Sequence, residues 1–432
     1  MNANAKRIVL TSFGSLGDLH PYIAVALGLK ARGHNVVLAT SAYYREKIQA
    51  LGIGFHAVRP DMPDFDANPE LAARLMDQRK GTERILLQLV FPALRDSYDD
   101  LLAAVQGADL LVSHSLTYAA PCIVEKIGIP WASTMLQPLG FFSVYDPPVL
   151  APAPFFSKLR FLGPLLYRPL FGLAKWSVHS WCEPLRRFRV DLGLPPAMVH
   201  PLIEAQHAPG LVLALFSELL AAKQRDWPVQ TRITGFPFYD RDGAAGMPTE
   251  LSQFLDAGPP PIVFTLGSSA VMDAGTFYHH SAEAAKLLGR RAVLLIGKNP
   301  CNRPPNLPDG IAAFDYAPFS ELFPHAAAIV HQGGVGTTGQ AMRSGRPMLV
   351  MPYAHDQPDN AERVTRLGIA RTIRRRHYTP ARVAKQLREL LDNQSYAIKA
   401  AEVGKRMAGE NGVQAACDAL EGFLKDNYSN AL

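Results

Sequence analysis

The sequence predicts an α/β protein of two domains, each built around a parallel sheet. A β-loop-α-β pattern opens the chain: Arg7 to Thr11 and Val36 to Thr40 have the composition of buried strands, and residues 19–30 between them have that of a helix. The pattern starts again at Pro261 to Leu266, where another apolar run leads into a Gly-Ser-Ser loop. With 432 residues, of which 48% are hydrophobic, the chain can bury two cores.

Cysteine placement and the first residues argue against a zinc-binding, disulfide-rich or secreted protein. Cys122, Cys182, Cys301 and Cys417 are far apart and form no Cys-X-X-Cys pair, so the sequence predicts neither a zinc site nor a disulfide framework. The segment ahead of Ile8 is too short and too polar for a secretory signal. We therefore expect a cytoplasmic location, with the inner face of the membrane as a further expectation.

The net charge of +6 is concentrated in one segment. Between Lys158 and Arg189, seven Lys and Arg residues stand against Glu183 alone, and the overlapping segment 141–181 is rich in Pro, Phe, Leu, Tyr and Trp. Two interpretations fit: a surface that meets lipid headgroups or an apolar ligand, or a helical region whose long basic side chains cover its own apolar residues. No apolar run predicts a membrane-spanning helix, and no nucleic-acid-binding module is present.

The most informative stretch lies between residues 315 and 361. Ala326 to Val330 is a short apolar run that leads through His331 into a glycine-rich loop, and Thr337 to Ser344 has the composition of a helix start. This order brings backbone N–H groups and hydroxyls to a helix N-terminus, a favourable place for a phosphate group. The next buried strand leads to the carboxyl edge of the sheet, where such sheets bind ligands, and to His355, Asp356, Gln357 and Asn360.

This stretch resembles the nucleotide-sugar signature of family-one glycosyltransferases. The matching residues occur in order, with one additional residue in the glycine loop: Pro318, His331, Gly333, Thr337, Gly345, Pro347, Pro352, Asp356, Gln357 and Asn360. The resemblance implies the GT-B architecture, in which two Rossmann-like domains face one another across a cleft and the last helix crosses back to the first domain. The string T-G-F-P-F-Y-D at 234–240 resembles the interdomain link of the rhamnolipid rhamnosyltransferase branch.

The first loop of the chain carries the candidate catalytic residues. It reads G-S-L-G-D-L-H-P, which lacks the spacing of a dinucleotide-binding loop. In the enzymes that the chain resembles this loop holds the catalytic base, and counting back from Pro21 places Asp18 at that position, as in many bacterial members. His20 is retained as a weaker catalytic candidate. His114 stands at the strand end where plant members have the aspartate that partners their histidine.

Asp18 and His114 follow strands of one predicted sheet, so both side chains could meet at its carboxyl edge. Either Asp18 takes the proton of a hydroxyl nucleophile while His114 steers it, or His114 is the base and Asp18 orients its ring. His114 as a hydrogen-bonded surface residue is the remaining alternative.

The candidate donor-binding residues combine this loop chemistry with the resemblance. Tyr316 stands where plant enzymes have the tryptophan that stacks on uracil, and Gln340 where they have the glutamate that binds the ribose hydroxyls. A neutral amide binds a diol less firmly, which leaves dTDP-sugars open. No Asp-X-Asp pair stands at a strand end, so we expect no metal and no cofactor. The full donor set is Gly17, Ser268, Ser269, Tyr316, Ala317, His331, Gly333, Gly334, Gly336, Thr337, Thr338, Gln340, His355, Asp356 and Gln357.

The resemblance implies an inverting glycosyltransferase that moves a hexose from a nucleotide sugar to a hydroxyl of a small lipophilic acceptor. UDP-glucose is the first choice of donor, and dTDP-rhamnose or another dTDP-sugar the second. We expect a phenolic, sterol or terpenoid, or hydroxy-fatty-acid acceptor against Phe141, Phe142 and Tyr145. The alternative is a non-catalytic nucleotide-sugar-binding protein of the same fold.

We expect four segments along the chain: an acceptor-binding domain (1–225), a linker (226–245), a nucleotide-sugar-binding domain (246–415) and a helix (416–432) that packs on the first domain. The partners we expect are the donor and the acceptor, without nucleic acid and with peripheral membrane contact left open. The protein is expected to be a monomer or weak dimer.

Overall fold

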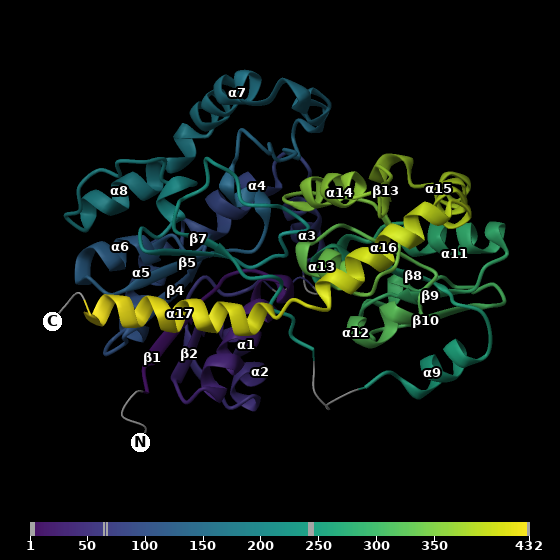
Figure 1. The fold of residues 1–432 in the computed structure, drawn as a ribbon, viewed down its shortest axis with the longest axis horizontal. Coiled ribbons are helices and arrows are strands. Elements are labelled where there is room, and N and C mark those ends of the chain that lie inside the picture. The colour runs from purple at the N-terminus through teal and green to yellow at the C-terminus, as the bar shows by residue number, and fades with distance from the viewer. Residues whose placement is uncertain (1–4, 64, 66–67, 241–245, 430–432) are drawn as a thin grey trace.

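The computed structural model describes residues 5–63, 65, 68–240 and 246–429. In this part of the chain two parallel sheets form separate layers, each with helices on both faces (Figure 1). The strands are short runs of Val, Ile, Leu and Ala, because a sheet covered on both faces buries the side chains of both its sides. The predicted pair of α/β domains is confirmed.

The first sheet has the order β3-β2-β1-β4-β5-β6-β7, and its described pairs are all parallel. In register, Thr11 at the end of β1 lies beside Ser113, so the loops after β1 and β4 leave the sheet together. The strands are β1 (Arg7–Thr11), β2 (Asn35–Thr40), β3 (Gly54–Ala57), β4 (Leu110–His114), β5 (Trp131–Met135), β6 (Leu211–Ala214) and β7 (Thr231–Ile233).

The second sheet has the order β10-β9-β8-β11-β12-β13 and is also parallel throughout its described pairs. Ala328 pairs with Ile262 and Val330 with Phe264, which brings the loops after β8 and β11 together. The strands are β8 (Ile262–Thr265), β9 (Ala292–Leu295), β10 (Ile311–Phe314), β11 (Ala328–His331), β12 (Met348–Val350) and β13 (Ala370–Thr372).

Helices surround each sheet. Those of the first domain are α1 (Leu16–Ala31), α2 (Arg45–Ala50), α3 (Pro69–Leu75), α4 (Gly81–Arg84), α5 (Leu94–Ala104), α6 (Ala119–Ile127), α7 (Gly163–Ser177) and α8 (Glu183–Asp191). Those that follow are α9 (Thr249–Asp256), α10 (Gly267–Ala270), α11 (Phe277–Leu288), α12 (Phe319–Leu322), α13 (Val335–Arg343), α14 (Gln357–Arg366), α15 (Pro380–Asp392), α16 (Gln394–Met407) and α17 (Gly412–Ser429).

The last helix, α17, returns to the first domain, as the resemblance implied. Figure 1 shows it lying along that domain, in yellow beside the purple and blue elements. Ala416, Leu420 and Leu424 are buried in the same apolar cluster as β1 and α1. Arg32 of α1 makes ion pairs with Asp418 (2.6 Å) and Glu421 (2.9 Å). The helix begins at Gly412, four residues before the expected boundary.

The segment between the domains is shorter than expected. Thr231–Ile233 forms β7, the outermost strand of the first sheet, and so belongs to the first domain although it lies within the expected linker. Residues 241–245 of that linker lie outside the described residues. In the described part of the chain, every helix is too short or too polar to cross a bilayer.

Candidate active site

Each domain presents its candidate loops where the strand order of its sheet reverses. In the first sheet β1 lies between β2 and β4, and in the second β8 lies between β9 and β11. Such a reversal opens a crevice at the carboxyl edge of the sheet, where ligands bind. The expected catalytic residues follow β1 and β4, and the expected phosphate-binding loops follow β8 and β11.

Asp18 is held in position by the start of α1. Ser15 is the N-cap of this helix; its backbone N–H donates to Oδ2 of Asp18 (2.8 Å), and its hydroxyl donates to the same oxygen (3.2 Å). Gly14, with φ of +134°, permits this approach, because a Cβ there would lie 2.3 Å from Oδ2. Gly17 completes the turn by donating its N–H to the Ser15 hydroxyl. Asp18 is therefore fixed by the capping box of α1 while its side chain stays partly exposed.

His114 ends β4 and lies behind Asp18. Its Nε2 is 3.8 Å from Oδ1 of Asp18, and the side chain of His114 is 2% exposed, against 32% for Asp18. Its Nδ1 accepts a long hydrogen bond from the backbone N–H of Leu116 (3.4 Å), which favours the tautomer with the proton on Nε2, facing Asp18. The structure thus brings the two predicted residues together.

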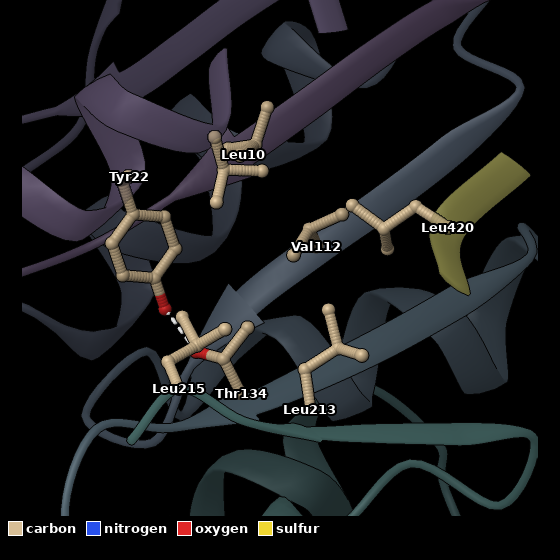
Figure 2. Close-up of a pocket in the computed structure, with 8 residues that line it drawn as sticks. Leu10, Tyr22, Val112, Thr134, Leu213, Leu215 and Leu420 are labelled. Atoms are coloured by element: carbon tan, nitrogen blue, oxygen red, sulfur yellow. Dashed lines mark hydrogen bonds between the residues drawn. The ribbon is translucent and has the colours of Figure 1, made fainter. Parts of the chain in front are cut away.

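Tyr22 of α1 supports the imidazole of His114. The two rings meet edge to face, with centroids 6.0 Å apart, and the Tyr22 hydroxyl hydrogen-bonds to Thr134 on β5 (Figure 2). Beside this bond lies a void with room for about one water molecule. A void of this size cannot hold a sugar or an acceptor. It is lined by core side chains, which include Leu10, Val112, Leu213, Leu215 and Leu420.

Burial shifts the two groups of this pair in opposite senses. It raises the pKa of Asp18 to about 6, against the opposing effect of the Ser15 hydrogen bonds, and it lowers the pKa of His114 to about 4. At neutral pH Asp18 is therefore mostly ionised and His114 is neutral. Asp18 is also the more accessible of the two, so a hydroxyl in the cleft meets Asp18 first.

His20, the weaker catalytic candidate, has other neighbours. Its Nε2 lies 2.8 Å from Nζ of Lys47 on α2, and its ring lies 5.2 Å from that of Tyr239 in the interdomain segment. These contacts place His20 beside the connection between the domains. They assign it no part in the pair formed by Asp18 and His114.

His331 shapes the glycine loop from inside the second domain. It is fully buried; its Nδ1 accepts from the N–H of Gly333 (3.0 Å), and its Nε2 lies 3.3 Å from Sδ of Met348. Burial lowers its pKa to about 3, so the ring is neutral. His331 belongs to the donor-binding set predicted from the sequence. In the structure both its ring nitrogens are directed at protein atoms, so its contribution is to the form of the loop.

The start of α13 is suited to an anion. No side chain of the described residues caps this helix at Gly334, which leaves the N–H groups of its first turn directed outward. Oγ1 of Thr338 and Oε1 of Gln332 are buried and have no hydrogen-bond partner within the described chain. Thr337 is nearly buried beside them, and a Cβ added at Gly336 would meet no atom within 4 Å, so a ligand can approach this turn closely.

The loop after β8 joins this site to Asp18. A Cβ at Gly267, which has φ of +64°, would lie 2.4 Å from Nε2 of Gln332, so this loop packs tightly against the glycine loop. Oγ of Ser268 lies 3.4 Å from Oγ of Ser15, the residue that caps α1 and binds Asp18. Ser269 follows on the short helix α10. The second domain therefore touches Ser15, the residue whose backbone and side chain bind Asp18.

The start of α14 is the third element at this site, beside the glycine loop and the loop after β8. Nδ2 of Asn360 donates to Oδ2 of Asp356 (2.7 Å) and to the carbonyl of Gly333 (2.9 Å), and Oε1 of Gln357 accepts from the N–H of Tyr353. Burial raises the pKa of Asp356 to about 7, and the negative charge of Asp18 adds to the shift. One carboxylate from each domain thus lies close enough to affect the ionisation of the other.

Other predicted donor residues have different surroundings. Gln340 donates to Asp240 (3.2 Å) and accepts from Arg343 (2.8 Å), so it is bound to the interdomain segment. Nδ1 of His355 lies 3.0 Å from the hydroxyl of Thr82 in the first domain. The side chain of Ala317 is buried in the core, and Tyr316 beside it is half exposed.

The predicted acceptor residues divide into core and surface. Phe141 is 5% exposed and stacks on Trp227, with ring centroids 3.9 Å apart, so it is a core residue and does not line a cleft. Phe142 has φ of +46°, an uncommon backbone conformation for a bulky residue, and its ring contacts Phe171 of α7. Tyr145 is 41% exposed.

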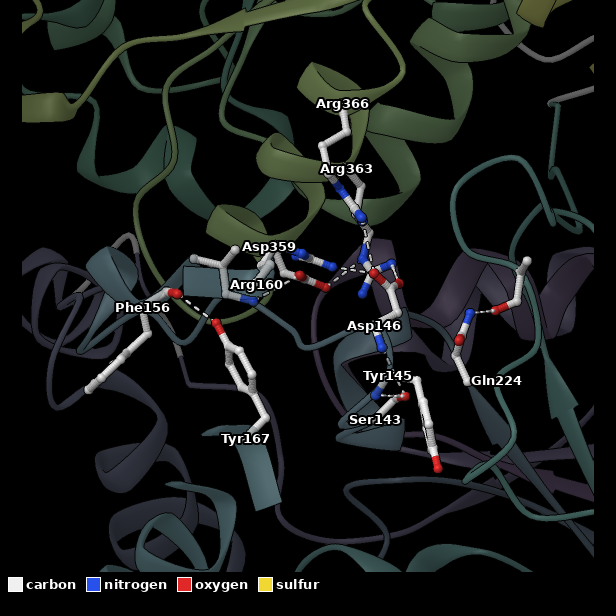
Figure 3. Close-up of polar contacts among 12 residues, drawn as sticks. Ser143, Tyr145, Asp146, Phe156, Arg160, Tyr167, Gln224, Asp359, Arg363 and Arg366 are labelled. Atoms are coloured by element: carbon white, nitrogen blue, oxygen red, sulfur yellow. Dashed lines mark hydrogen bonds and ion pairs between the residues drawn. The ribbon is translucent and has the colours of Figure 1, made fainter. Parts of the chain in front are cut away.

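Sequence reasoning missed a buried ion-pair network that follows Tyr145. Asp146, in the first domain, pairs with Arg160 and with Arg363 and Arg366 of α14 (Figure 3). Arg363 also binds Asp359 (2.7 Å), which in turn accepts the N–H of Val149 (2.9 Å). These contacts, which we call the Asp146 network, attach the loop expected to meet the acceptor directly to α14, the helix that follows Asp356.

Matches to known proteins agree with this arrangement. Residues 8–130 match the model of the glycosyltransferase family 28 N-terminal domain, and residues 284–421 match that of the erythromycin biosynthesis protein CIII-like C-terminal domain. O-mycaminosyltylonolide 6-deoxyallosyltransferase of Streptomyces fradiae is 32% identical over 428 residues, which are 96% of this chain and 97% of that protein. A sterol 3-beta-glucosyltransferase of Aspergillus fumigatus is 27% identical over 97% of this chain, which spans 30% of its length.

Solved structures share the fold. The glycosyltransferase of kitacinnamycin superposes with a TM-score of 0.73 at 21% identity, over 98% of this chain and 100% of that one. VinC, solved in complex with dTDP, gives 0.67 at 21% identity, over 97% and 100%. Together with the near-full-length relative, the two facing sheets and the returning helix α17 establish the family. The chain belongs to the family-one glycosyltransferases of the GT-B fold and is a sugar-transferring enzyme.

Proposed function

We propose that this enzyme transfers a hexose or deoxyhexose, with inversion, from a nucleotide sugar to a hydroxyl of a small lipophilic acceptor. The observation that carries the proposal is the contact between Ser15 and Ser268. It joins Ser15, which binds Asp18, to the loop after β8, and that loop packs through Gly267 against Gln332, just before the uncapped start of α13. We infer from this chain of contacts that Asp18 and the start of α13 serve one site, Asp18 as the base and the helix end as the anion-binding group.

The reaction divides between the two domains. The acceptor oxygen forms a bond to the anomeric carbon while its proton passes to the carboxylate of Asp18. The bond from that carbon to the leaving diphosphate breaks, and the electron pair leaves with the diphosphate. The N–H groups at the start of α13 stabilise the charge that grows there. Neutral His114 lies behind the carboxylate, with Nε2 3.8 Å from Oδ1 of Asp18 and without a hydrogen-bond partner among the described residues; we assign it a positioning role toward Asp18. Asp18 is the proposed base because it is both accessible and the more basic of the pair.

We place dTDP-deoxyhexoses ahead of UDP-glucose as donors. The relative with 32% identity is named for transfer of a 6-deoxyallosyl group, and VinC was solved with dTDP. Gln340 carries no charge and is bound to Arg343 and Asp240, so it offers a ribose diol no carboxylate. For the acceptor, the names of the relatives support a macrolactone or sterol-like molecule. Asp356 and Gln357, at the start of α14, are proposed to bind sugar hydroxyls.

Purified protein incubated with dTDP- and UDP-sugars and a panel of macrolactones, sterols and phenols tests the proposal, with products read by mass spectrometry. We expect a glycoside of the acceptor and release of the nucleoside diphosphate, unchanged by EDTA because protein groups bind the diphosphate. Donor binding without acceptor-dependent turnover across the panel would instead support a nucleotide-sugar-binding protein.

A further inference from the structure

Helix α7 presents apolar side chains to solvent along one face. Leu165, Leu173 and Trp176 are 91%, 60% and 74% exposed, and Phe161, just before the helix, is 81% exposed. Positions 165, 173 and 176 lie on one side of a helix, because they are separated by eight and three residues. Figure 1 shows α7 at the outer edge of the first domain, away from both sheets. We call these four side chains the outer face of α7.

The opposite side of α7 is anchored in the protein. Tyr167 and Phe171 are buried; the Tyr167 hydroxyl donates to the carbonyl of Phe156 (Figure 3), and Phe171 packs against Phe142. The helix is therefore held with its outer face turned outward. Three large apolar side chains on one exposed helix face, Trp176 among them, with Phe161 exposed just before the helix, are unusual for a surface that meets only water.

The segment that carries the outer face has an excess of positive charge. Residues 147–182 contain no Asp or Glu, and Lys158 and Arg168 are exposed within them. Lys175 pairs with Glu204 from outside the segment, and Arg186 and Arg187, farther along, pair with Glu183. Lys158 and Arg168 thus lie in an acid-free segment beside an apolar face, the composition of helices that lie in the headgroup region of a membrane.

We propose that the outer face of α7 docks the enzyme on an anionic lipid surface. Phe161, Leu165, Leu173 and Trp176 enter the boundary between headgroups and acyl chains, and Lys158 and Arg168 meet lipid phosphates. A second copy of this chain fits the same face less well, because a two-fold contact would set these cations against their own copies. The proposal is independent of the sugar and acceptor assigned above.

Co-sedimentation of the full chain with vesicles tests this docking. We expect binding to phosphatidylcholine vesicles that contain phosphatidylglycerol, little binding to phosphatidylcholine alone, and weaker binding at high salt. The Leu165→Ser and Trp176→Ser double variant should bind at least about tenfold more weakly, since each residue loses the burial of a large apolar side chain. Arg168→Glu should weaken binding to anionic vesicles without the loss of an apolar group.

The matched control is a Val229→Ser and Ile398→Ser double variant, which removes two other exposed apolar side chains, 89% and 57% exposed, outside α7. It should bind vesicles like the wild-type chain. Absence of wild-type binding to anionic vesicles would overturn the proposal, as would equal binding by the α7 variant. A wild-type dimer in solution that the α7 variant converts to monomer, without vesicle binding by either, would assign the face to a second copy instead.

Discussion

Asp18 is the side chain on which transfer depends most in the proposed reaction. Asp18→Asn keeps the size of the group but cannot take a proton, so we expect the rate of transfer to fall by about 10²–10⁴. The rate should fall more with alkyl alcohols as acceptors than with acidic phenols, because a phenol gives up its proton more readily and needs a base less. Nucleoside diphosphate affinity should change little, because α13 supplies that site; calorimetry of binding and initial rates measure the two effects separately.

His20→Ala is the control for this loss. It lies two residues away on α1 but contacts Lys47 and Tyr239, so its removal should cost little activity. Near wild-type rates for Asp18→Asn with all acceptors, or a loss in His20→Ala as large as in Asp18→Asn, would contradict the assignment.

The pH dependence of transfer follows from the raised pKa of Asp18. A general base works only when deprotonated, so kcat/KM should fall as the pH drops through about 6 and level off above it. His114, with a pKa of about 4, stays neutral through this range and should not produce this decline. The pH–rate profile of His114→Asn should therefore still show the decline of kcat/KM near pH 6, although the rates are lower at every pH. Loss of this decline in that variant would make His114 the base.

At the scale of single residues, the sequence predicted which side chains come together better than it predicted which way a given ring faces. Asp18 and His114 could be paired because each follows a strand of the same sheet, and parallel strands end at a common edge. Phe141 and His331 could not be placed, because composition does not tell whether a ring enters the core, as Phe141 does against Trp227, or faces a cleft. The donor roles of the individual glycine-loop residues stay predictions.

At the scale of an element, the turn from β11 into α13 makes two glycines differ in what they tolerate. Gly333 has φ of +89°, and a Cβ there would lie 2.9 Å from Val350, whereas a Cβ at Gly336 meets open space. Gly333→Ala should lower the midpoint of thermal unfolding and weaken nucleoside diphosphate binding. Gly336→Ala should keep or raise the midpoint, since alanine favours a helix.

Differential scanning fluorimetry with and without dTDP or UDP separates these effects. Without ligand, Gly336→Ala should at least keep the midpoint of the wild type. If dTDP or UDP then raises the midpoint of this variant less than that of the wild type, the diphosphate binds at this turn. Equal midpoints for the two glycine variants would show that the backbone conformation at 333 is less restrictive than the structure indicates.

Elements were predicted well where apolar runs are bounded by glycine or proline, as at 326–347. They were predicted less well where a strand is short. Thr231–Ile233 has only three residues and carries Arg232 on an outer strand, so its pattern could not be told from a linker. Its pairing with β6 depends on contacts that a local pattern does not contain.

At the scale of the whole molecule, the Asp146 network joins the domains through buried charges. Arg363 and Asp359 are almost fully buried, so Arg363→Met leaves a carboxylate without its partner and should cost about 3–5 kcal/mol of stability. Arg366→Met removes an arginine that binds the same Asp146 but is 41% exposed, and should cost no more than about 1 kcal/mol. Urea denaturation of both variants gives the comparison.

The two variants should also differ in acceptor binding. Since Val149 and Asp146 hold the loop that contains Tyr145, Arg363→Met should raise the acceptor KM more than the donor KM, and Arg366→Met should change neither greatly. Equal stability of the two variants, or a change confined to the donor KM, would mean that the network does not position this loop. No local pattern predicts the part of the network that joins the domains, because Asp146 and Val149 are more than 200 residues from Arg363 and Asp359 and meet them only when the domains dock.

One consequence of the contact between the domains concerns what happens after the proton moves. The carboxylate that receives the proton also belongs to the capping box of α1, and a neutral carboxylic acid accepts the two hydrogen bonds from Ser15 less strongly. Ser15 in turn touches Ser268 across the cleft. Each completed transfer therefore weakens the hydrogen bonds that fix Ser15, the residue that touches the second domain, until the proton is lost to water.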